Sequence, residues 1–360
     1  MKPDFWGRLS NRLALTARVL LQGGRALGPQ KLVGRGVGRT PVAAITPEEI
    51  AEVQLFFKRP KFFIFGHARS GTTLLVRLIR LHPEVHCNYQ AHFFTRPPLL
   101  EALVDDPQIE SWLARRSNRW NGGRDLSPLV LRVVADFVME REAKHLHKRI
   151  VGDKSPSSLL DGEAVRKMVK VYPDATLLYI VRDGRDTALS HRFQTFIDGA
   201  QHLSPEDLKL RDTFALDPEP FLRGERSIFT ENGIRTAAES WARNVTETEA
   251  MGKSLYGERY ASLRYEDLLS DPLGQMRRLW RVLGADPDLP QLKTTLEQEL
   301  QSNPDADWQR EKAGEIADPL QKGKRGSWRV MFTARDRAIF EAAAGDTLRA
   351  WGYKHTGGVG

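Results

Sequence analysis

A glycine-bounded loop with one arginine is the stretch of this sequence best suited to bind a phosphate. It reads GHARSGTT over residues 66–73, between the apolar run KFFIF (residues 61–65) and a segment with helical periodicity. A strand, a loop and a helix in this order aim backbone N–H groups and a helix N-terminus at one point, which suits a phosphate. Arg69 can clamp an oxygen pair in bidentate fashion, and the loop hydroxyls add further donors.

The loop lacks the lysine of the common ATP-binding pattern G-x-x-x-x-G-K-[ST]. Thr72 stands at the position of that lysine, which neutralises the β- and γ-phosphates in ATP-binding proteins. This substitution disfavours a Mg-ATP hydrolase or an ordinary kinase. The alternative, an accidental Gly-rich turn, fits the flanking strand and helix less well.

A second cationic segment, RDGRDTALS, follows the apolar run TLLYIV at residues 176–181. Arg182 begins it and Ser190 lies eight residues on, about two helical turns away, so the two side chains can converge on one anion. The alternative is that Arg182 or Arg185 forms ion pairs with the neighbouring aspartates, which are common and weak.

Two further segments carry residues that could contact a bound nucleotide. The first is the cationic glycine loop KGKRGSWR at residues 322–329, and the second is RYEDL at residues 264–268. Taken alone, such a glycine loop is usually a solvated turn, and Tyr265 is equally well explained as a half-buried aromatic at a strand end.

In this order the segments resemble the sulfotransferases that use 3′-phosphoadenosine 5′-phosphosulfate (PAPS), and the resemblance covers most of residues 60–335. RSGTT is similar to the 5′-phosphosulfate loop of tyrosylprotein and many bacterial sulfotransferases. The resemblance implies a 3′-phosphate site at Arg182 and Ser190, a closing loop at Lys322 and Gly323, and an adenine contact at Tyr265. The implied PAPS-binding residues are therefore Arg69, Ser70, Gly71, Thr72, Thr73, Arg182, Ser190, Tyr265, Lys322 and Gly323. PAPS would leave as adenosine 3′,5′-bisphosphate (PAP), and the motifs require no metal.

Sulfuryl transfer needs cations for the developing charge and a base for the acceptor proton. Arg69 suits the first role, as does Lys154, whose segment GDKSP resembles a family segment in which the lysine faces the transferring group; its alternative is a surface ion pair with Asp153. In the relatives with an arginine in the loop, a Glu commonly follows that arginine by 21 residues, but here that position is Gln90. A carboxamide is no useful base.

His92 is the local substitute for the missing base. If the stretch is extended, His92 points to the same side as Gln90, and its pKa suits proton transfer near neutral pH. A packed histidine beside Phe93 and Phe94 is the equally weighted alternative. Further candidates for the base are Asp153, His67 and His191.

Alternating elements must position these residues. Apolar runs predict strands at 61–65, 85–87, 150–151, 176–181 and 259–264, and periodic segments predict helices at 71–81, 127–147 and 271–283. The alternation predicts an α/β fold, a mainly parallel sheet of the P-loop-NTPase type with helices on both faces. The polar stretches 195–232 and 302–325 are expected to be long irregular segments, and residues 195–232 form an insertion that, with residues 91–120, shapes the acceptor site.

Charge is distributed unevenly along the chain. Of the formal charge of +8, residues 1–46 carry +7, and the remaining residues carry +1. A basic N-terminal extension (residues 1–50) followed by one sulfotransferase domain (residues 51–360) is therefore expected, and nucleic acid is not an expected partner. Residues 1–40 fit a short surface helix or frayed tail, a peripheral contact with a membrane surface, or a mitochondrial transit segment.

The remaining expectations concern compartment and function. The single cysteine, Cys87, indicates a reducing compartment such as the cytoplasm, and no apolar run reaches the ~20 residues that span a bilayer. The expected function is transfer of a sulfuryl group from PAPS to a hydroxyl or amine of an acceptor. A catalytically silent nucleotide-binding module and a small-molecule kinase are the alternatives, and the motifs specify neither an acceptor nor an oligomeric state.

Overall fold

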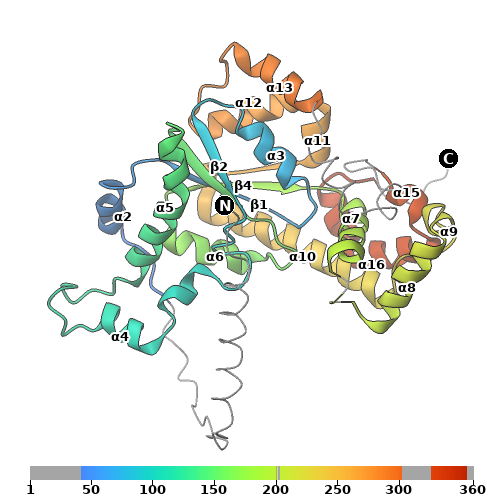
Figure 1. The fold of residues 1–360 in the computed structure, drawn as a ribbon, viewed down its shortest axis with the longest axis horizontal. Helices are drawn as coiled ribbons and strands as arrows, with labels where there is room; N and C mark the ends of the chain where they lie inside the picture. The colour runs from blue at the N-terminus through green and yellow to red at the C-terminus, as the bar shows by residue number, and fades with distance from the viewer. Residues whose placement is uncertain (1–41, 200, 202, 302–325, 355–360) are drawn as a thin grey trace, which may run out of the picture. The chain divides into compact units, whose positions relative to one another are not determined.

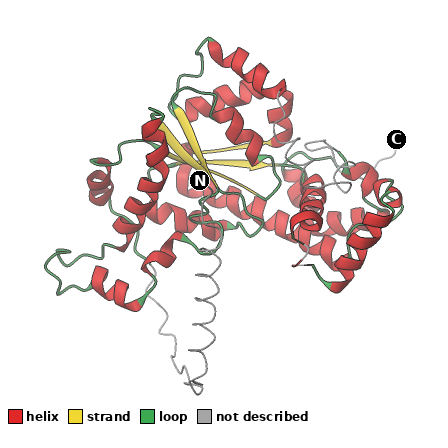
Figure 2. Ribbon diagram, in the orientation of Figure 1, coloured by secondary structure: helices red, strands yellow, loops and turns green. Residues whose placement is uncertain are grey.

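Five parallel strands form one sheet in the computed structural model, which describes residues 42–199, 201, 203–301 and 326–354. The strand order is β2-β3-β1-β4-β5, and every neighbouring pair is parallel. Helices lie on both sides of the sheet (Figure 2). The predicted α/β fold with a parallel sheet is therefore confirmed.

The predicted strands are all present, and two of them, β2 and β3, are longer than predicted by two residues or more. The strands are β1 (Lys61–Gly66), β2 (Val85–Tyr89), β3 (Ile150–Lys154), β4 (Thr176–Val181) and β5 (Tyr260–Arg264). The additional residues of β2 and β3 are polar, at 88–89 and 153–154, and they pair with one another in register. Apolar runs therefore predict these two strands but not their polar ends.

The two faces of the sheet are covered by different sets of helices, and alternate strand residues supply each face. Phe63 and Phe65 of β1 pack into a core shared with the helices on one face, whereas Phe62 and Ile64 pack into a second core on the other. The helices of the first face include α5 (Ser127–His145), α6 (Gly162–Val171), α10 (Glu231–Tyr256) and α16 (Ala334–Ala350); those of the second face include α3 (Thr72–Ile79), α11 (Tyr265–Ser270), α12 (Pro272–Val282) and α13 (Gln291–Gln301).

The other helices lie at the margins of these layers (Figure 1). They are α2 (Pro47–Gln54), η1 (Leu100–Val104), α4 (Pro107–Ala114), α7 (Gly184–Asp198), α8 (Pro205–Leu216), α9 (Glu219–Leu222), η3 (Gly257–Arg259) and α15 (Trp328–Met331). In the described part of the chain, no helix is long and apolar enough to cross a membrane.

The stretch 195–232 is largely helical, so the expectation of a long irregular segment is wrong. Its prolines do not interrupt helices: Pro205 occupies the first turn of α8, where Ser204 caps the helix, and α9 begins directly after Pro218. Phe196, Phe214 and Phe221 are buried together, with ring centroids of neighbouring pairs 5.6–6.2 Å apart. These aromatics therefore serve as core and do not line an acceptor surface. The second such stretch, 302–325, lies outside the described residues.

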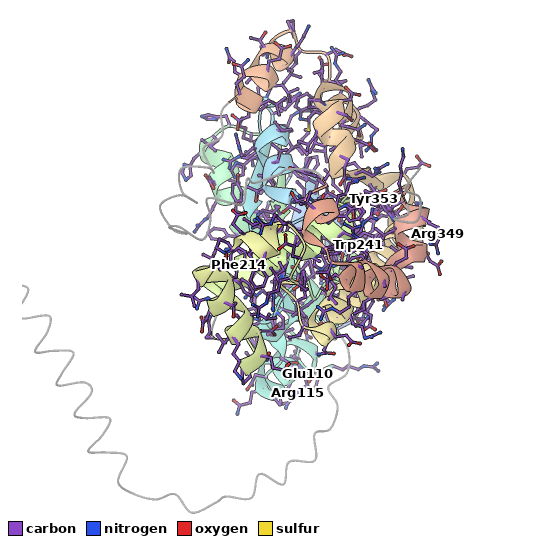
Figure 3. The ribbon with its side chains drawn as sticks, turned by 90° about the vertical axis from the view of Figure 1, so that its right-hand side faces the viewer. Glu110, Arg115, Phe214, Trp241, Arg349 and Tyr353 are labelled. Carbon is purple, nitrogen blue, oxygen red and sulfur yellow. The ribbon has the colours of Figure 1, made fainter. Side chains whose placement is uncertain are left out.

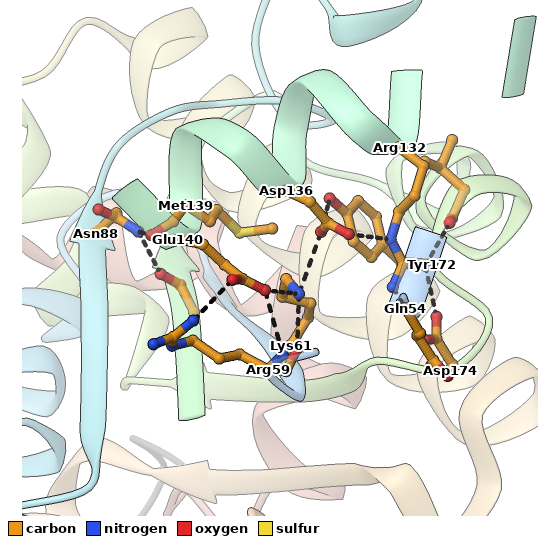
Figure 4. Close-up of polar contacts among 12 residues, drawn as sticks. Gln54, Arg59, Lys61, Asn88, Arg132, Asp136, Met139, Glu140, Tyr172 and Asp174 are labelled. Atoms are coloured by element: carbon orange, nitrogen blue, oxygen red, sulfur yellow. Dashed lines mark hydrogen bonds and ion pairs between the residues drawn. The ribbon is translucent and has the colours of Figure 1, made fainter. Parts of the chain in front are cut away.

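A buried network of charged side chains joins α5 to the amino end of the sheet (Figure 4). Lys61 Nζ, at the start of β1, lies 2.9 Å from Glu140 Oε1 and 3.5 Å from Asp136 Oδ1. Arg132 continues the network with a contact of 2.9 Å to Asp136 and one of 2.7 Å to Asp174. Each buried charge in this network has partners of opposite sign, so we assign the network a structural role. It lies at the amino ends of the strands, on the edge of the sheet opposite their carboxyl ends.

Candidate functional site

The loop between β1 and α3 has a tightly specified backbone. Arg69 and Gly71 both have positive φ, at 75° and 89°. A Cβ at Gly71 would lie 2.2 Å from Cδ2 of Tyr265, so a side chain is excluded by contact as well as by conformation. The left-handed conformation of a non-glycine residue such as Arg69 is uncommon and concentrates at functional sites.

Residues from two distant segments, 182–190 and 264–268, meet at this loop. Arg69 Nε donates to Ser190 Oγ at 3.1 Å, and Arg182 Nη1 donates to the carbonyl of Arg69 at 3.3 Å. The Arg182 guanidinium lies 5.1 Å from the centroid of the Tyr265 ring. We call Arg69, Arg182, Ser190 and Tyr265 the arginine cluster. Arg182 and Ser190 thus both contact Arg69, and Tyr265 lies beside Arg182.

The donors around the loop fit an anion. Ser70 is fully buried, and its Oγ has no hydrogen-bond partner among the described residues. Buried hydroxyls without a partner are costly, and phosphate oxygens would satisfy them. Thr72 and Thr73 open α3, where the helix N-terminus adds N–H groups and a partial positive charge. Two guanidinium groups, orphaned donors and a helix start together suit phosphate groups.

The other arginine of the RDGRDTALS segment has a structural role. Arg185 is buried and lies 2.7 Å from Asp183, as the ion-pair alternative predicted, and it stacks 3.7 Å from the ring centroid of Trp328. Asp186 accepts from the backbone N–H groups of Gly326 (2.7 Å) and Trp328 (3.2 Å). These contacts attach the described end of the KGKRGSWR segment to the start of α7.

Lys322 and Gly323, which the resemblance implies as PAPS-binding residues of that segment, lie outside the described residues. The anchoring contacts were not expected from sequence, although Asp186 is part of the motif. Burial raises the pKa of Asp186, and the nearby Arg182 opposes this shift.

Trp241 is a further residue that the sequence did not indicate. Its Nε1 donates to the carbonyl of Arg182 at 3.2 Å, from a helix that carries no motif (Figure 3).

A second group of polar residues lies at the carboxyl ends of β2 and β3. Three successive backbone N–H groups after β2 donate to the end of β3: Gln90 to the Lys154 carbonyl (2.7 Å), Ala91 to Asp153 Oδ1 (3.1 Å), and His92 to Ser155 Oγ (2.9 Å). We call residues 90–92, held by residues 153–155, the clamped turn. The strand end is itself fixed to β1, because Ser155 N donates to the Ile64 carbonyl at 3.0 Å.

Asp153 is fully buried in this turn, and both of its carboxylate oxygens have partners. Oδ2 accepts from the Ser155 hydroxyl and Oδ1 from Ala91 N. Burial raises the pKa of Asp153 to about 6, and the two hydrogen bonds and the charge of Lys154 limit the rise. Lys154 is only 1 % exposed, with Nζ 5.2 Å from the centroid of the Tyr89 ring. It is therefore no surface lysine.

His92 is partly buried in the clamped turn, with Nδ1 3.0 Å from Thr95 Oγ1. Burial lowers its pKa, and the charges of Arg96 and Lys154 lower it further, which favours the neutral ring that a base requires. The expectation of an extended stretch is wrong, because Gln90 and His92 have φ of 59° and 54°. The clamp, and not strand alternation, determines the placement of His92.

The other two histidines named as candidates lie beside the phosphate loop. Their rings are 6.2 Å apart. Burial lowers the pKa of His67 to about 4, and His67 Nε2 has no partner among the described residues. Burial also lowers the pKa of His191, assisted by the charges of Arg69 and Arg192. In the described part of the chain, no group of three or more potential ligand side chains could hold a metal ion.

Comparison with known proteins gives matches over the same segments. A model of the sulfotransferase family matches residues 60–290. A protein-tyrosine sulfotransferase of Drosophila melanogaster is 31% identical over 134 residues, which is 36% of this chain and 25% of that protein. Heparan sulfate glucosamine 3-O-sulfotransferase 3B1 of Mus musculus is 26% identical over 269 residues, which is 72% of this chain and 56% of that protein.

Among solved structures, a mouse sulfotransferase complexed with PAP has a TM-score of 0.42 and 18% sequence identity, with 84% of this chain and 90% of that chain covered.

Proposed function

The chain belongs to the sulfotransferase family, and from this premise we propose that it transfers a sulfuryl group from PAPS to a hydroxyl or amine of an acceptor. The observation that carries the proposal is the arginine cluster. Arg69 comes from the phosphate loop and Arg182 and Ser190 come from the RDGRDTALS segment, and they meet beside the buried Ser70 hydroxyl. Two guanidinium groups, hydroxyl groups and the start of α3 at one point supply the hydrogen-bond donors and the positive charge that bind a phosphate.

Each residue of the arginine cluster has a proposed role in binding PAPS. Arg69 and the N–H groups from Ser70 to Thr73 hold the 5′-phosphosulfate. Arg182 and Ser190 hold the 3′-phosphate, Tyr265 lies against the adenine, and Lys322 and Gly323 close over the 3′-phosphate. Anchoring of Gly326 and Trp328 by Asp186 supports the last role, because it holds the end of that segment close to Arg182.

The clamped turn has the proposed catalytic roles. PAPS supplies an activated sulfuryl group on a phosphate leaving group. His92 takes the proton of the acceptor as the acceptor oxygen or nitrogen bonds to sulfur and the sulfur–oxygen bond to the phosphate breaks. Lys154 and Arg69 stabilise the charge on the sulfuryl oxygens and the departing phosphate. Asp153 and Ser155 are positioning residues, since their side chains hold the backbone of the turn.

Two measurements test the proposal. Thermal unfolding with PAP, PAPS or Mg-ATP should give a large rise in Tm for PAP and PAPS only, because ligands stabilise the state that binds them. A larger rise with Mg-ATP would indicate a kinase. Formation of PAP in the presence of hydroxyl-bearing lipids, sugars, phenols or peptides, with a gain of one sulfuryl mass in the acceptor, should then identify the substrate. Binding of PAPS with no PAP formed from any acceptor class would indicate a silent nucleotide-binding module.

The domain organisation and compartment remain part of the proposal. Residues 51–360 would form the catalytic domain, with the helical segment 195–232 as an insertion and residues 1–50 as a basic extension. The single buried cysteine is consistent with a reducing compartment such as the cytoplasm.

A further inference from the structure

Exposed apolar side chains are concentrated on one part of the surface. Of the sixteen large hydrophobic side chains exposed in the described part of the chain, eleven belong to α2, η1, α4 and α5 or to residues that follow these helices. All of these helices pack together, and Arg124, after α4, lies 3.9 Å from Glu52 of α2. Figure 1 shows α2, α4 and α5 on the same side of the molecule. We call this surface the α2–α4–α5 face.

Two tryptophans form the most apolar feature of this face. Trp112 of α4 and Trp120 of the following loop are 59 % and 51 % exposed, and their rings stack with centroids 4.9 Å apart. The loop that carries Trp120 is held by side-chain hydrogen bonds, from Asn118 to the Trp112 carbonyl (2.9 Å) and from Asn121 to the Leu113 carbonyl (3.0 Å). The structure thus presents two indoles to water in a fixed arrangement, which indicates an interaction site.

The segment that carries Trp120 is basic, although acidic residues such as Glu52 and Glu110 lie beside it. Four arginines lie between Glu110 and Asp125 with no acidic residue among them, at positions 115, 116, 119 and 124. All four are exposed, and the side chain of Arg115 points away from the body in Figure 3. Among the described residues Arg116 and Arg119 form no ion pair, whereas Arg124 lies 3.9 Å from Glu52. An anionic partner fits these arginines.

We propose that the α2–α4–α5 face docks on an anionic lipid membrane. Indole rings favour the interface between lipid headgroups and acyl chains, and guanidinium groups pair with lipid phosphates. A soluble anionic polysaccharide would engage the arginines, but it has no use for the exposed Leu55, Phe56 and Phe137 on the same face. A membrane accepts both, because its acyl chains cover the apolar side chains. The proposal concerns the folded body, separate from residues 1–40, and does not depend on the proposed catalytic activity.

Vesicle binding by the full chain tests whether the arginines of the α2–α4–α5 face contribute to membrane binding. On vesicles of phosphatidylcholine with phosphatidylglycerol, Arg116→Glu/Arg119→Glu should lose about thirtyfold or more in apparent affinity, since each basic side chain near an anionic surface contributes about fivefold. The matched reversal Arg243→Glu/Arg281→Glu, at exposed positions of α10 and α12, should bind as the unchanged protein does. Equal losses in the two pairs, or no loss in the first, would overturn the proposal.

Fluorescence quenching tests the position of the tryptophans. In a Trp6→Phe background, vesicles with brominated acyl chains should quench part of the tryptophan emission. Trp112→Phe/Trp120→Phe should abolish that quenching while the protein still binds, because phenylalanine keeps an apolar ring. Quenching that survives this pair of substitutions contradicts the proposal, as does binding to a soluble sulfated polysaccharide with no partition onto vesicles.

Discussion

The arginine cluster and the clamped turn occupy the same edge of the sheet but are built in different ways. In the cluster, the side chains of residues 69, 182, 190 and 265 meet at one loop and contact one another mainly through their own polar groups and rings. In the clamped turn, three backbone N–H groups depend on one strand end, so the side chains of residues 153 and 155 determine where residue 92 lies. The proposed binding of PAPS is therefore distributed over side chains in the cluster, whereas the position of the proposed base depends on hydrogen bonds to the backbone of the turn.

The largest expected effect is a loss of turnover without a loss of nucleotide binding, which would separate the role of the clamped turn from that of the arginine cluster. His92→Ala should lower kcat by about 10²- to 10⁴-fold, the usual contribution of a positioned base, with the Kd for PAP unchanged. Rapid-mix measurement of PAP formation with a saturating acceptor checks the first value, and calorimetry with PAP checks the second.

Asp153→Asn is the matched control for His92→Ala. An asparagine can still accept from Ala91 and can donate to the Ser155 hydroxyl, so the turn should persist and kcat should change far less. If Asp153→Asn abolishes turnover and His92→Ala does not, the carboxylate is the base and the roles are reversed.

The next effect belongs to the arginine cluster. Arg69→Ala and Arg182→Ala should each weaken PAP binding by about 10- to 150-fold, since a hydrogen bond to a charged group contributes about 1.5–3 kcal/mol. Calorimetric titration with PAP measures the loss, and Arg243→Ala, an exposed arginine of α10, is the control. Unchanged affinity in both variants would remove the basis for the proposed function.

The cluster was predictable from sequence because its residues follow apolar runs at fixed spacing. Arg182 directly follows β4, Ser190 lies on α7, and parallel strands bring all carboxyl ends to one edge of the sheet. The clamped turn was less predictable from sequence. Its shape depends on a left-handed backbone at Gln90 and His92 and on hydrogen bonds to residues 153–155, which lie far away in the sequence. Trp241 had no signal at all: it acts through the carbonyl of Arg182 from a helix without a motif. Long-range packing of this kind leaves no local pattern.

Acid titration should sharpen the comparison, because the two regions contain buried groups with opposite shifts. Burial lowers the pKa of His67 from its ordinary 6.5 to about 4, and the contact with the Ala68 carbonyl opposes this shift only in part. Its contribution to stability is fully present above pH 6.5 and is lost as the pH falls towards 4. His67→Gln should therefore reduce acid destabilisation in this window, by up to about 3 kcal/mol.

Asp153 has the opposite sign. Its pKa of about 6 in the folded protein exceeds the ordinary 3.8, so its contribution is fully present below pH 3.8 and is lost as the pH rises through 6. Asp153→Asn should remove this decline, again up to about 3 kcal/mol. Urea unfolding of both variants at a series of pH values measures the slopes. Parallel slopes in the two variants would contradict the assignment of separate buried groups to the two regions.

The smallest expected effect tests the support of His92. Ser155→Ala removes the acceptor for His92 N and the donor to Asp153, and should cost about 1–3 kcal/mol of stability, as for other buried hydrogen bonds. Because the imidazole remains, kcat should fall less than in His92→Ala, and KM for PAPS should not change. If Ser155 had a structural role alone, Ser155→Ala would leave the pH profile of kcat unchanged. If Ser155 positions His92, Ser155→Ala should shift the pH profile of kcat, and Ser155→Thr should restore the profile because threonine returns the hydroxyl. A normal profile in Ser155→Ala would mean that the turn holds its shape without the clamp, and that the backbone conformation at residues 90–92 is fixed from the β2 side.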